Sequence, residues 1–127
     1  MKSTITISAA ESVVMKVLWQ RKSPMGTEEV VAALPDPEKW QLSTVKTLLN
    51  RLLKKGAVKA EREGRRYLYS PMIQREQWVS DESLSLLDRL FGGRVAPLVA
   101  HFSQTRKLSR KDIADLKKLI RELDDER

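Results

Sequence analysis

Residues 42–56 have the sequence LSTVKTLLNRLLKKG, in which apolar and polar side chains alternate with the period of a helix. The apolar residues recur at i, i+3, i+4, i+7 and i+8: Val45, Leu48, Leu49, Leu52 and Leu53. This spacing predicts one apolar stripe on a helix over residues 43–55, and Gly56 is typical of the position just past a helix end. Polar and basic side chains occupy the other side, so the helix can bury one face and present the other to a partner.

Two helices are predicted before this one, and the second of them is short. Ser8-Ala9-Ala10-Glu11 has the pattern of a capping box, in which the Ser8 oxygen accepts a backbone N–H and Glu11 reaches back to the cap. A second helix is expected to begin with Thr27 as its N-cap and to stop before Pro35. The dipeptide Met25-Gly26 is expected to form a short extended link between the two helices.

After Gly56 the apolar pattern changes to a period of two, which is typical of strands. We expect strands over residues 57–61 and 67–71, joined by a hairpin turn at residues 63–66 where Gly64 supplies a positive φ. The order helix, extended link, helix, helix, strand, turn, strand is that of a winged helix-turn-helix. The fold class is therefore mainly α with a small sheet (α+β), and the turn at 63–66 is its wing.

The rest of the chain is expected to be helical. Residues 73–91 carry apolar side chains at helical spacing and are followed by Gly92-Gly93, which ends the helix. Residues 95–102 form a short apolar segment that contains Pro97. Ser109 then begins a last helix with a narrow apolar stripe.

This C-terminal region is too small to bury its apolar side chains on its own, which favours a homodimer. We therefore expect two domains, a winged-helix domain over residues 1–72 and a helical dimerisation domain over residues 73–127. The alternative is that these helices fold back on their own winged domain. The side chains expected at the dimer interface are Leu87, Leu90, Phe91, Leu98, Phe102, Ile113, Leu116, Leu119, Ile120 and Leu123.

The positive charge is confined to one part of the sequence. The 127 residues include 24 Lys and Arg against 17 Asp and Glu, a net charge of +7. Residues 39–66 alone contain nine basic and two acidic side chains, so this segment carries the whole excess and the remainder is electrically neutral. A basic charge localised in this way indicates a polyanion-binding surface.

This segment contains the side-chain types that read duplex DNA from a helix in the major groove. Lys46 can donate to guanine or to a phosphate, Asn50 can pair with adenine, and the methyl group of Thr47 can pack on thymine. Hydroxyl and basic groups around them suit phosphates. The expected DNA-binding residues are Ser43, Thr44, Lys46, Thr47, Asn50, Arg51, Lys54, Lys55, Arg65 and Arg66. The alternative is a solvated surface helix, which the hairpin and the localised charge disfavour.

Composition excludes several other classes of protein. With no Cys and one His there is neither a disulfide framework nor a thiolate zinc site, and no metal or cofactor is expected. No catalytic constellation and no Gly-rich phosphate loop is evident, so the chain is not expected to be an enzyme. No apolar run approaches the ~18 residues of a membrane span, and residues 1–8 lack a signal-peptide core. We expect a cytoplasmic protein without stable membrane association.

The sequence resembles the BlaI/MecI/CopY family of penicillinase-type repressors along essentially its whole length. The segments TVKTLLNRL (residues 44–52) and FGG (residues 91–93) are the most specific part of the resemblance. Further matching segments are AESVVMKVLW (10–19), TEEVV (27–31), YLYSP (67–71), LDRLFGG (87–93), LVAHF (98–102) and LS (108–109).

The resemblance implies a dimeric transcriptional repressor whose winged domain binds a palindromic operator of inverted TACA/TGTA-type half-sites. Relatives control β-lactamase or penicillin-binding-protein genes and so antibiotic resistance. In such relatives a membrane sensor leads to cleavage of the repressor between an Asn and a Phe. The matching bond here is His101–Phe102, which implies a sensor-linked protease as a partner, although His stands in place of Asn. Copper-sensing relatives carry a C-terminal cysteine cluster, which this chain lacks.

Three other interpretations remain open from the residues. His101 beside Phe102 is typical of a packed or interface residue rather than of a cleavage site. The chain also fits a winged-helix regulator that is released by a small ligand, or one that acts through protein or RNA contacts. Steeply salt-dependent, sequence-specific binding of duplex DNA would separate the repressor from the last of these.

Overall fold

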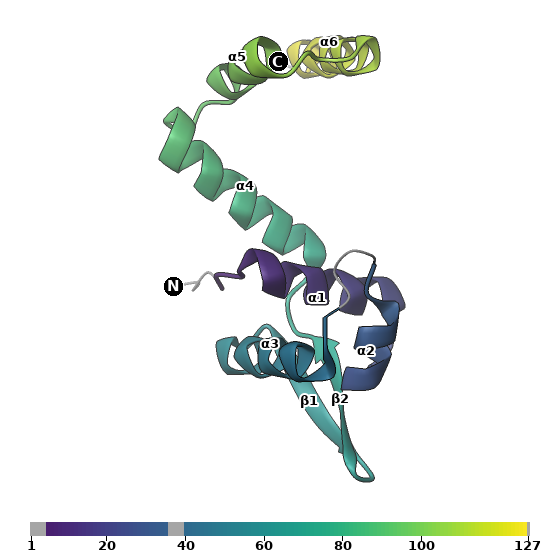
Figure 1. The fold of residues 1–127 in the computed structure, drawn as a ribbon. Helices are drawn as coiled ribbons and strands as arrows, with labels where there is room; N and C mark the ends of the chain where they lie inside the picture. Colours follow the sequence, from purple (N-terminus) through teal and green to yellow (C-terminus); the bar gives the residue numbers. More distant parts are fainter. Residues whose placement is uncertain (1–4, 36–39, 127) are drawn as a thin grey trace. The chain divides into compact units, whose positions relative to one another are not determined.

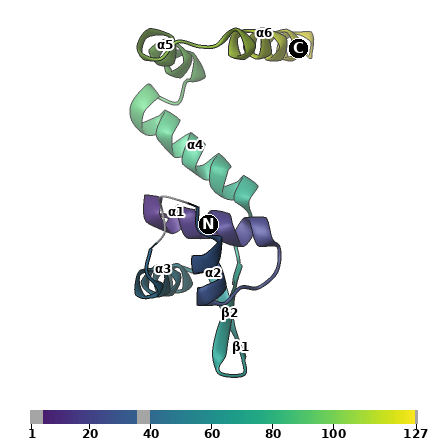
Figure 2. The same ribbon diagram turned by 45° about the vertical axis from the view of Figure 1, so that its right-hand side comes forward.

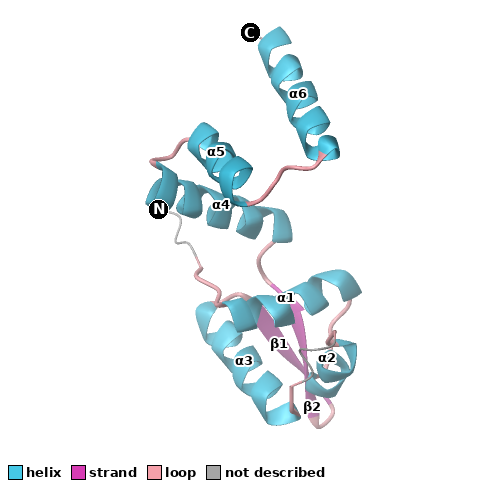
Figure 3. Ribbon diagram, turned by 45° about the horizontal axis from the view of Figure 1, so that its top comes forward, coloured by secondary structure: helices cyan, strands magenta, loops and turns pink. Residues whose placement is uncertain are grey.

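The computed structural model describes residues 5–35 and 40–126 and is mainly helical, as predicted (Figure 1). It has two compact units, Met1–Asp81 and Glu82–Arg127. The elements in chain order are α1 (Ala9–Arg21), α2 (Thr27–Ala33), α3 (Leu42–Lys55), β1 (Val58–Glu63), β2 (Arg66–Pro71), α4 (Arg75–Phe91), α5 (Val95–Thr105) and α6 (Arg110–Asp125). Figure 3 shows that the single two-stranded ribbon is the only sheet among the described elements.

Helix α1 begins with the predicted capping box. The Ser8 hydroxyl accepts the Glu11 N–H at 3.1 Å, and the Glu11 carboxylate accepts the Ser8 N–H at 2.8 Å. The helix ends at Arg21, where Lys22 adopts a left-handed conformation with φ of 58°. Residues other than glycine rarely adopt this backbone conformation. At Lys22 it ends the helix and turns the chain toward the extended link and α2.

The first unit has a closed apolar core. It is formed by one face each of α1, α2 and α3 together with the ribbon, and the side chains fully removed from solvent are Val14, Met15, Leu18, Met25, Val30, Val45, Leu49, Leu52 and Ala57. Leu53, which we expected in the buried stripe of α3, is instead 39% exposed. At about 100° per residue it lies roughly 80° away from Val45 around the helix, at the edge of the stripe.

The ribbon is an antiparallel hairpin whose register runs from Val58 opposite Pro71 to Glu63 opposite Arg66. Two residues therefore make the turn, and the strands extend closer to it than expected. Gly64 is the first of the two and has φ of 64°, as the type II′ hairpin turn requires. Figures 1 and 2 both show the ribbon extending past the ends of α2 and α3.

The predicted extended link is present and pairs with β2 through an isolated bridge rather than through a strand of its own. Met25 forms an isolated antiparallel bridge with Tyr69, in which the Met25 N–H donates at 2.9 Å and the Tyr69 N–H donates at 2.7 Å. The link thereby joins the helix-turn-helix to β2, and both side chains lie in the core. The wing is thus attached at its base to the segment between α1 and α2.

The first turns of α4 belong to the first unit. The Trp19 indole N–H donates to the Ile73 carbonyl at 3.0 Å, and the rings of Trp19 and Trp78 lie 5.5 Å apart. These contacts agree with the compact unit that ends at Asp81. The compact units describe which residues contact one another, not which segments fold independently. The expected domain boundary between residues 72 and 73 therefore stays a prediction.

The second unit, from Glu82 onward, has no fully buried side chain in its described part. Helix α5 extends beyond the short apolar segment that we expected and accommodates Pro97 in its first turn, where a missing N–H costs nothing. The Ser109 hydroxyl caps α6 by accepting the Asp112 N–H at 3.0 Å, as predicted. None of the described helices combines the length and the apolar character needed to cross a membrane.

Candidate nucleic-acid interface

Helix α3 has one buried face and one solvent face, and the predicted readers lie on the solvent face. Val45, Leu49 and Leu52 are completely buried in the core of the first unit. The exposed residues of the helix include all of the predicted contacts on it: Ser43, Thr44, Lys46, Thr47, Asn50, Arg51, Lys54 and Lys55. The buried face holds the helix in place, which leaves hydroxyl, amide and basic groups available to a partner.

Thr47 is constrained within this solvent face. Its hydroxyl donates to the Ser43 carbonyl one turn earlier, at 3.0 Å. Because the hydroxyl already has a partner, the methyl group is the part of this side chain left for an apolar contact. The expected packing of the Thr47 methyl group on a thymine methyl group stays a prediction.

A groove joins α3 to the wing. It has a volume of about 270 Å³ and is lined by Gly26, Thr27, Glu28, Leu42, Lys46, Arg65, Arg66, Tyr67 and Tyr69. Lys46 of α3 and the two wing arginines therefore meet in one concave surface, although they are about twenty residues apart in sequence. A concave surface lined by basic groups is suited to a phosphate backbone.

Tyr67 is a residue of this groove that the sequence interpretation did not include. Its side chain is half exposed, whereas Tyr69 two residues later on the same strand face is buried. The signal was available in the strand pattern, because two tyrosines at i and i+2 share a face and only the inner one is within reach of the core. Tyr67 lines the same groove as Lys46 and Arg65, and its side chain carries a phenolic hydroxyl.

Lys55 has a partner inside the protein. Its ammonium donates to the Glu11 carboxylate at 2.5 Å and to the Thr6 carbonyl at 2.9 Å. Glu11 is only 1% exposed. Burial alone would raise the pKa of Glu11, but the hydrogen bond and charge of Lys55, together with the bonds to Ser8, outweigh it and lower that pKa. The contact joins the end of α3 to the start of α1.

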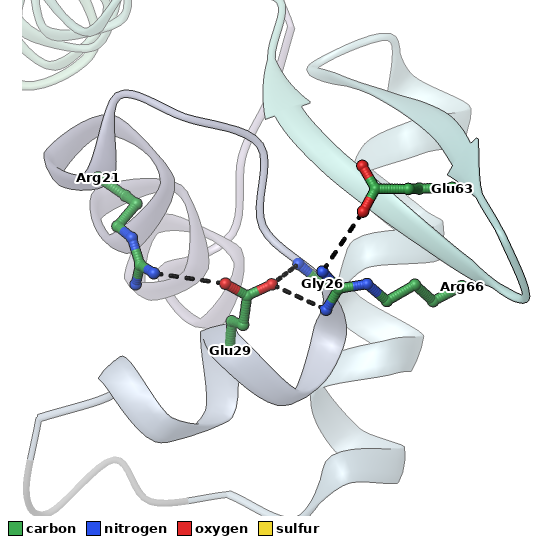
Figure 4. Close-up of polar contacts among 5 residues, drawn as sticks. All are labelled: Arg21, Gly26, Glu29, Glu63 and Arg66. Atoms are coloured by element: carbon green, nitrogen blue, oxygen red, sulfur yellow. Dashed lines mark hydrogen bonds and ion pairs between the residues drawn. The ribbon is translucent and has the colours of Figure 1, made fainter.

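Glu29 is the centre of a second ionic network, which Figure 4 shows. One carboxylate oxygen accepts the Gly26 N–H at 3.0 Å and an Arg66 N–H at 3.1 Å, and the other accepts Arg21 at 3.3 Å. Glu63 lies 3.8 Å from the second Arg66 nitrogen. The Gly26 hydrogen bond and the charges of Arg66 and Arg21 lower the pKa of Glu29, against the opposing effect of partial burial.

The same network corrects the predicted start of α2. Gly26, not Thr27, is the N-cap residue, and Thr27 is the first residue of the helix. The Glu29 side chain, rather than a threonine hydroxyl, makes the capping contact, because it reaches back to the free N–H of Gly26.

Arg65 differs from Arg66 in its surroundings. It is exposed, and it makes no ion pair or side-chain hydrogen bond with any residue that the structure describes. Lys39, the first basic residue of the charged segment, lies outside the described residues.

The residues expected at a dimer interface all lie in the second unit. Two apolar hollows of about 410 and 460 Å³ bring seven of them together: Leu87, Leu90, Phe91, Leu98, Phe102, Leu116 and Leu119. The remaining three, Ile113, Ile120 and Leu123, are exposed on α6 outside these hollows. The His101 ring lies 6.0 Å from that of Phe91 and 5.6 Å from that of Phe102, but the residue is exposed, so its role stays a prediction.

Comparison with known proteins finds the resemblance over nearly the whole chain. The family model described as penicillinase repressor matches residues 7–122. A penicillinase repressor of Bacillus licheniformis is 36% identical over 122 residues, which cover 96% of this chain and 94% of the relative. A penicillinase repressor of Staphylococcus aureus is 29% identical and covers 94% of each chain.

Two solved structures match the winged domain. One is the solution structure of the DNA-binding domain of the repressor BlaI, with 43% identity and a TM-score of 0.51 over 59% of this chain and 90% of that one. The other is Bacillus licheniformis BlaI in its monomeric form with the blaP half-operator, with 42% identity and a TM-score of 0.50 over 60% and 92%. The family model covers nearly all of the chain, and the solved structures share its winged-helix fold; the chain belongs to the penicillinase repressor family.

Proposed function

We propose that the chain is a homodimeric transcriptional repressor that binds a palindromic operator through α3 and the wing. The observation that carries this proposal is the solvent face of α3, where Lys46, Thr47 and Asn50 lie opposite a fully buried apolar face. The BlaI structure determined with the blaP half-operator supports duplex DNA as the partner. The function of the family supports repression rather than activation or catalysis.

Within this proposal the contacts divide into two kinds. Lys46, Thr47 and Asn50 read base edges in the major groove, and Ser43 and Thr44 supply hydroxyls at the start of the helix. Arg51, Lys54 and the wing bind phosphates on either side, which sets the register of α3 on the duplex without selecting a sequence. Lys46 also lines the groove toward the wing, so it connects the two kinds of contact.

The binding function is tested by selecting a site from a pool of random duplexes and comparing variants on that site. Lys46→Ala with Asn50→Ala should reduce the ratio of specific to non-specific affinity at least tenfold, since each reader contributes about 1–3 kcal/mol of discrimination. Lys16→Ala removes an equal charge from the exposed side of α1 and serves as the matched control. An unchanged ratio in the double variant would contradict the role of α3.

The homodimer is proposed from the second unit. Its helices have no buried side chain in the described residues, and large apolar groups such as Leu90, Ile120 and Leu123 are about 60% exposed. Exposed apolar surface of this extent needs a partner, and a second copy would also match the two-fold symmetry of a palindrome. Sedimentation of the full chain at several concentrations measures this directly.

Release from the operator is proposed to follow cleavage of the His101–Phe102 bond by a protease linked to a membrane sensor. Both residues are exposed in α5, and the bond corresponds in the family resemblance to the cleaved one. Helical backbone must unwind before a protease can bind it, so cleavage would require local opening of α5. Mass spectrometry of the repressor after β-lactam treatment tests this route: fragments ending at His101 support it, whereas release of an intact chain favours a small ligand.

A further inference from the structure

The two adjacent arginines of the wing face different environments. The Arg66 guanidinium contacts Glu29 at 3.1 Å and Glu63 at 3.8 Å, whereas Arg65 has no such partner among the described residues. Glu29 belongs to α2, 37 positions earlier in the chain. Arg66 therefore connects the wing to the helix-turn-helix, and Arg65 does not.

Glu29 joins three elements through one carboxylate. Arg66 comes from the first residue of β2, Arg21 from the last turn of α1, and Gly26 is the cap of α2 (Figure 4). Both carboxylate oxygens are occupied, one of them by two donors. Charge-assisted hydrogen bonds of this kind are directional, so they define where the guanidinium lies relative to α2.

Gly26 supplies the space for this pair. Its φ of −78° is open to any residue, so the backbone does not demand glycine here. A Cβ at this position would lie 3.3 Å from an Arg66 nitrogen and 3.4 Å from the Glu29 carboxylate. The absent side chain therefore allows the guanidinium to approach the start of α2.

Packing does not hold the outer part of the wing. Every side chain from Glu61 to Tyr67 is exposed, Leu68 is half-buried, and the first fully buried residue of β2 is Tyr69. A two-stranded ribbon has little stability on its own and can twist about its base. The Met25–Tyr69 bridge holds the base of the wing, and the contact between Arg66 and Glu29 is the ionic contact that ties the outer part of β2 to α2.

We propose that Arg66 is a positioning residue that holds the wing against α2 through Glu29, and that Arg65 is the arginine of the wing that contacts the DNA backbone. The proposal rests on the proposed DNA-binding function. It separates two side chains that the sequence placed together, and it assigns Glu29 a role in DNA binding without contact to DNA.

The salt dependence of DNA binding separates a positioning residue from a phosphate contact. With a random-sequence duplex, Arg65→Gln should reduce the slope of log affinity against log salt concentration by about 0.9, as expected for one lost phosphate contact. Arg66→Gln should weaken binding several-fold and leave the slope unchanged. A slope reduced by about 0.9 in Arg66→Gln would overturn the proposal.

Glu29→Gln gives a test in which the two readings predict opposite signs. The substitution keeps an oxygen that can cap Gly26 but removes the charge that holds Arg66. If Arg66 positions the wing, binding should weaken as in Arg66→Gln, and the double variant should be no weaker than either single one. If Arg66 contacts phosphate, removing a nearby acid should tighten binding, which would overturn the proposal. Glu76→Gln removes an equal charge from an exposed carboxylate in the first turn of α4, away from the groove, and is the matched control.

A measurement without DNA keeps this proposal distinct from the proposed function. Backbone order parameters from NMR relaxation of the free full chain should fall at Gly64 and Arg65 in Arg66→Gln and in Gly26→Ala, but not in Arg65→Gln. Unchanged order in all three variants would overturn the positioning role. If the unaltered chain fails to bind any duplex, the proposed function fails, while the order parameters still decide the role of Arg66.

Discussion

The two units of the chain differ in what they bury. The first unit encloses Met15, Leu18 and Leu49 completely and even buries the carboxylate of Glu11 beside a lysine. The second unit has helices of comparable length with strong apolar stripes, yet it fully buries no described side chain. The first unit therefore forms a closed core within one chain. The second unit exposes apolar side chains that a partner would have to cover before they formed a core. The difference fits the proposed division of roles, in which the first unit contacts DNA and the second carries the assembly.

The largest expected effect comes from breaking the assembly. Ile120→Asp places a charge on the apolar stripe of α6, where the side chain is 58% exposed in the single chain. If a second copy covers this stripe, the variant should be monomeric, and operator affinity should fall about a hundredfold or more because two linked half-site contacts become one. Sedimentation and titration with the full operator measure the two effects.

The control for this substitution is Lys117→Asp, on the same helix but outside its apolar stripe. The first unit should unfold at the same temperature in both variants as in the unaltered protein, because neither substituted residue belongs to it. A variant Ile120→Asp that remains dimeric would show that α6 does not form the interface.

A matched pair of leucines tests the contrast between the two cores. Leu49→Ala removes a completely buried side chain and should cost about 2–5 kcal/mol, at any protein concentration. Leu119→Ala removes a side chain that is about half exposed in the single chain, so it should matter only where a partner covers it. Thermal unfolding at two protein concentrations separates the cases: only the effect of Leu119→Ala should depend on concentration. A concentration-independent loss of equal size in both would mean that the second unit is stabilised within one chain.

Local patterns were sufficient to predict most of the first unit. The capping box at Ser8, the stripe of α3 and the hairpin around Gly64 depend on residues within about four positions of one another, and each is present. The exact ends of the strands were harder to predict, because they depend on the type of turn rather than on the alternation of side chains. Leu53 was wrongly predicted to be buried, because the spacing of apolar residues does not define the width of the buried face of the helix.

The ionic partners of the candidate site could not be predicted in the same way. Lys55 and Arg66 have the same local character as Lys54 and Arg65, but their carboxylate partners lie 44 and 37 positions away in sequence. Only the folded chain shows which member of each adjacent pair is engaged. In the second unit, the presence of the helices could be predicted from the sequence. The burial of their apolar side chains could not, because it depends on a partner surface outside the single chain.

The smallest of the three effects concerns Lys55 and Glu11. Lys55→Gln leaves the buried carboxylate without its cation and should cost about 1–3 kcal/mol near neutral pH, as for a lost hydrogen bond to a charged group. Since the pKa of Glu11 is lowered below its ordinary value of 4.5 in the folded chain, this stabilisation is complete above that value and disappears as the pH falls through the folded-state pKa. The gap in stability between the two proteins should therefore close on acidification, which urea unfolding at a series of pH values measures.

Lys54→Gln is the internal control, because this neighbouring lysine is exposed and makes no ion pair with the described residues. It should leave the free energy of unfolding unchanged at every pH but reduce the salt dependence of DNA binding by about 0.9 in slope. Lys55→Gln should do the reverse. If Lys55→Gln instead reduces the slope and leaves stability unchanged, Lys55 is a phosphate contact like its neighbour. The DNA-facing side of α3 would then include the last residue of the helix.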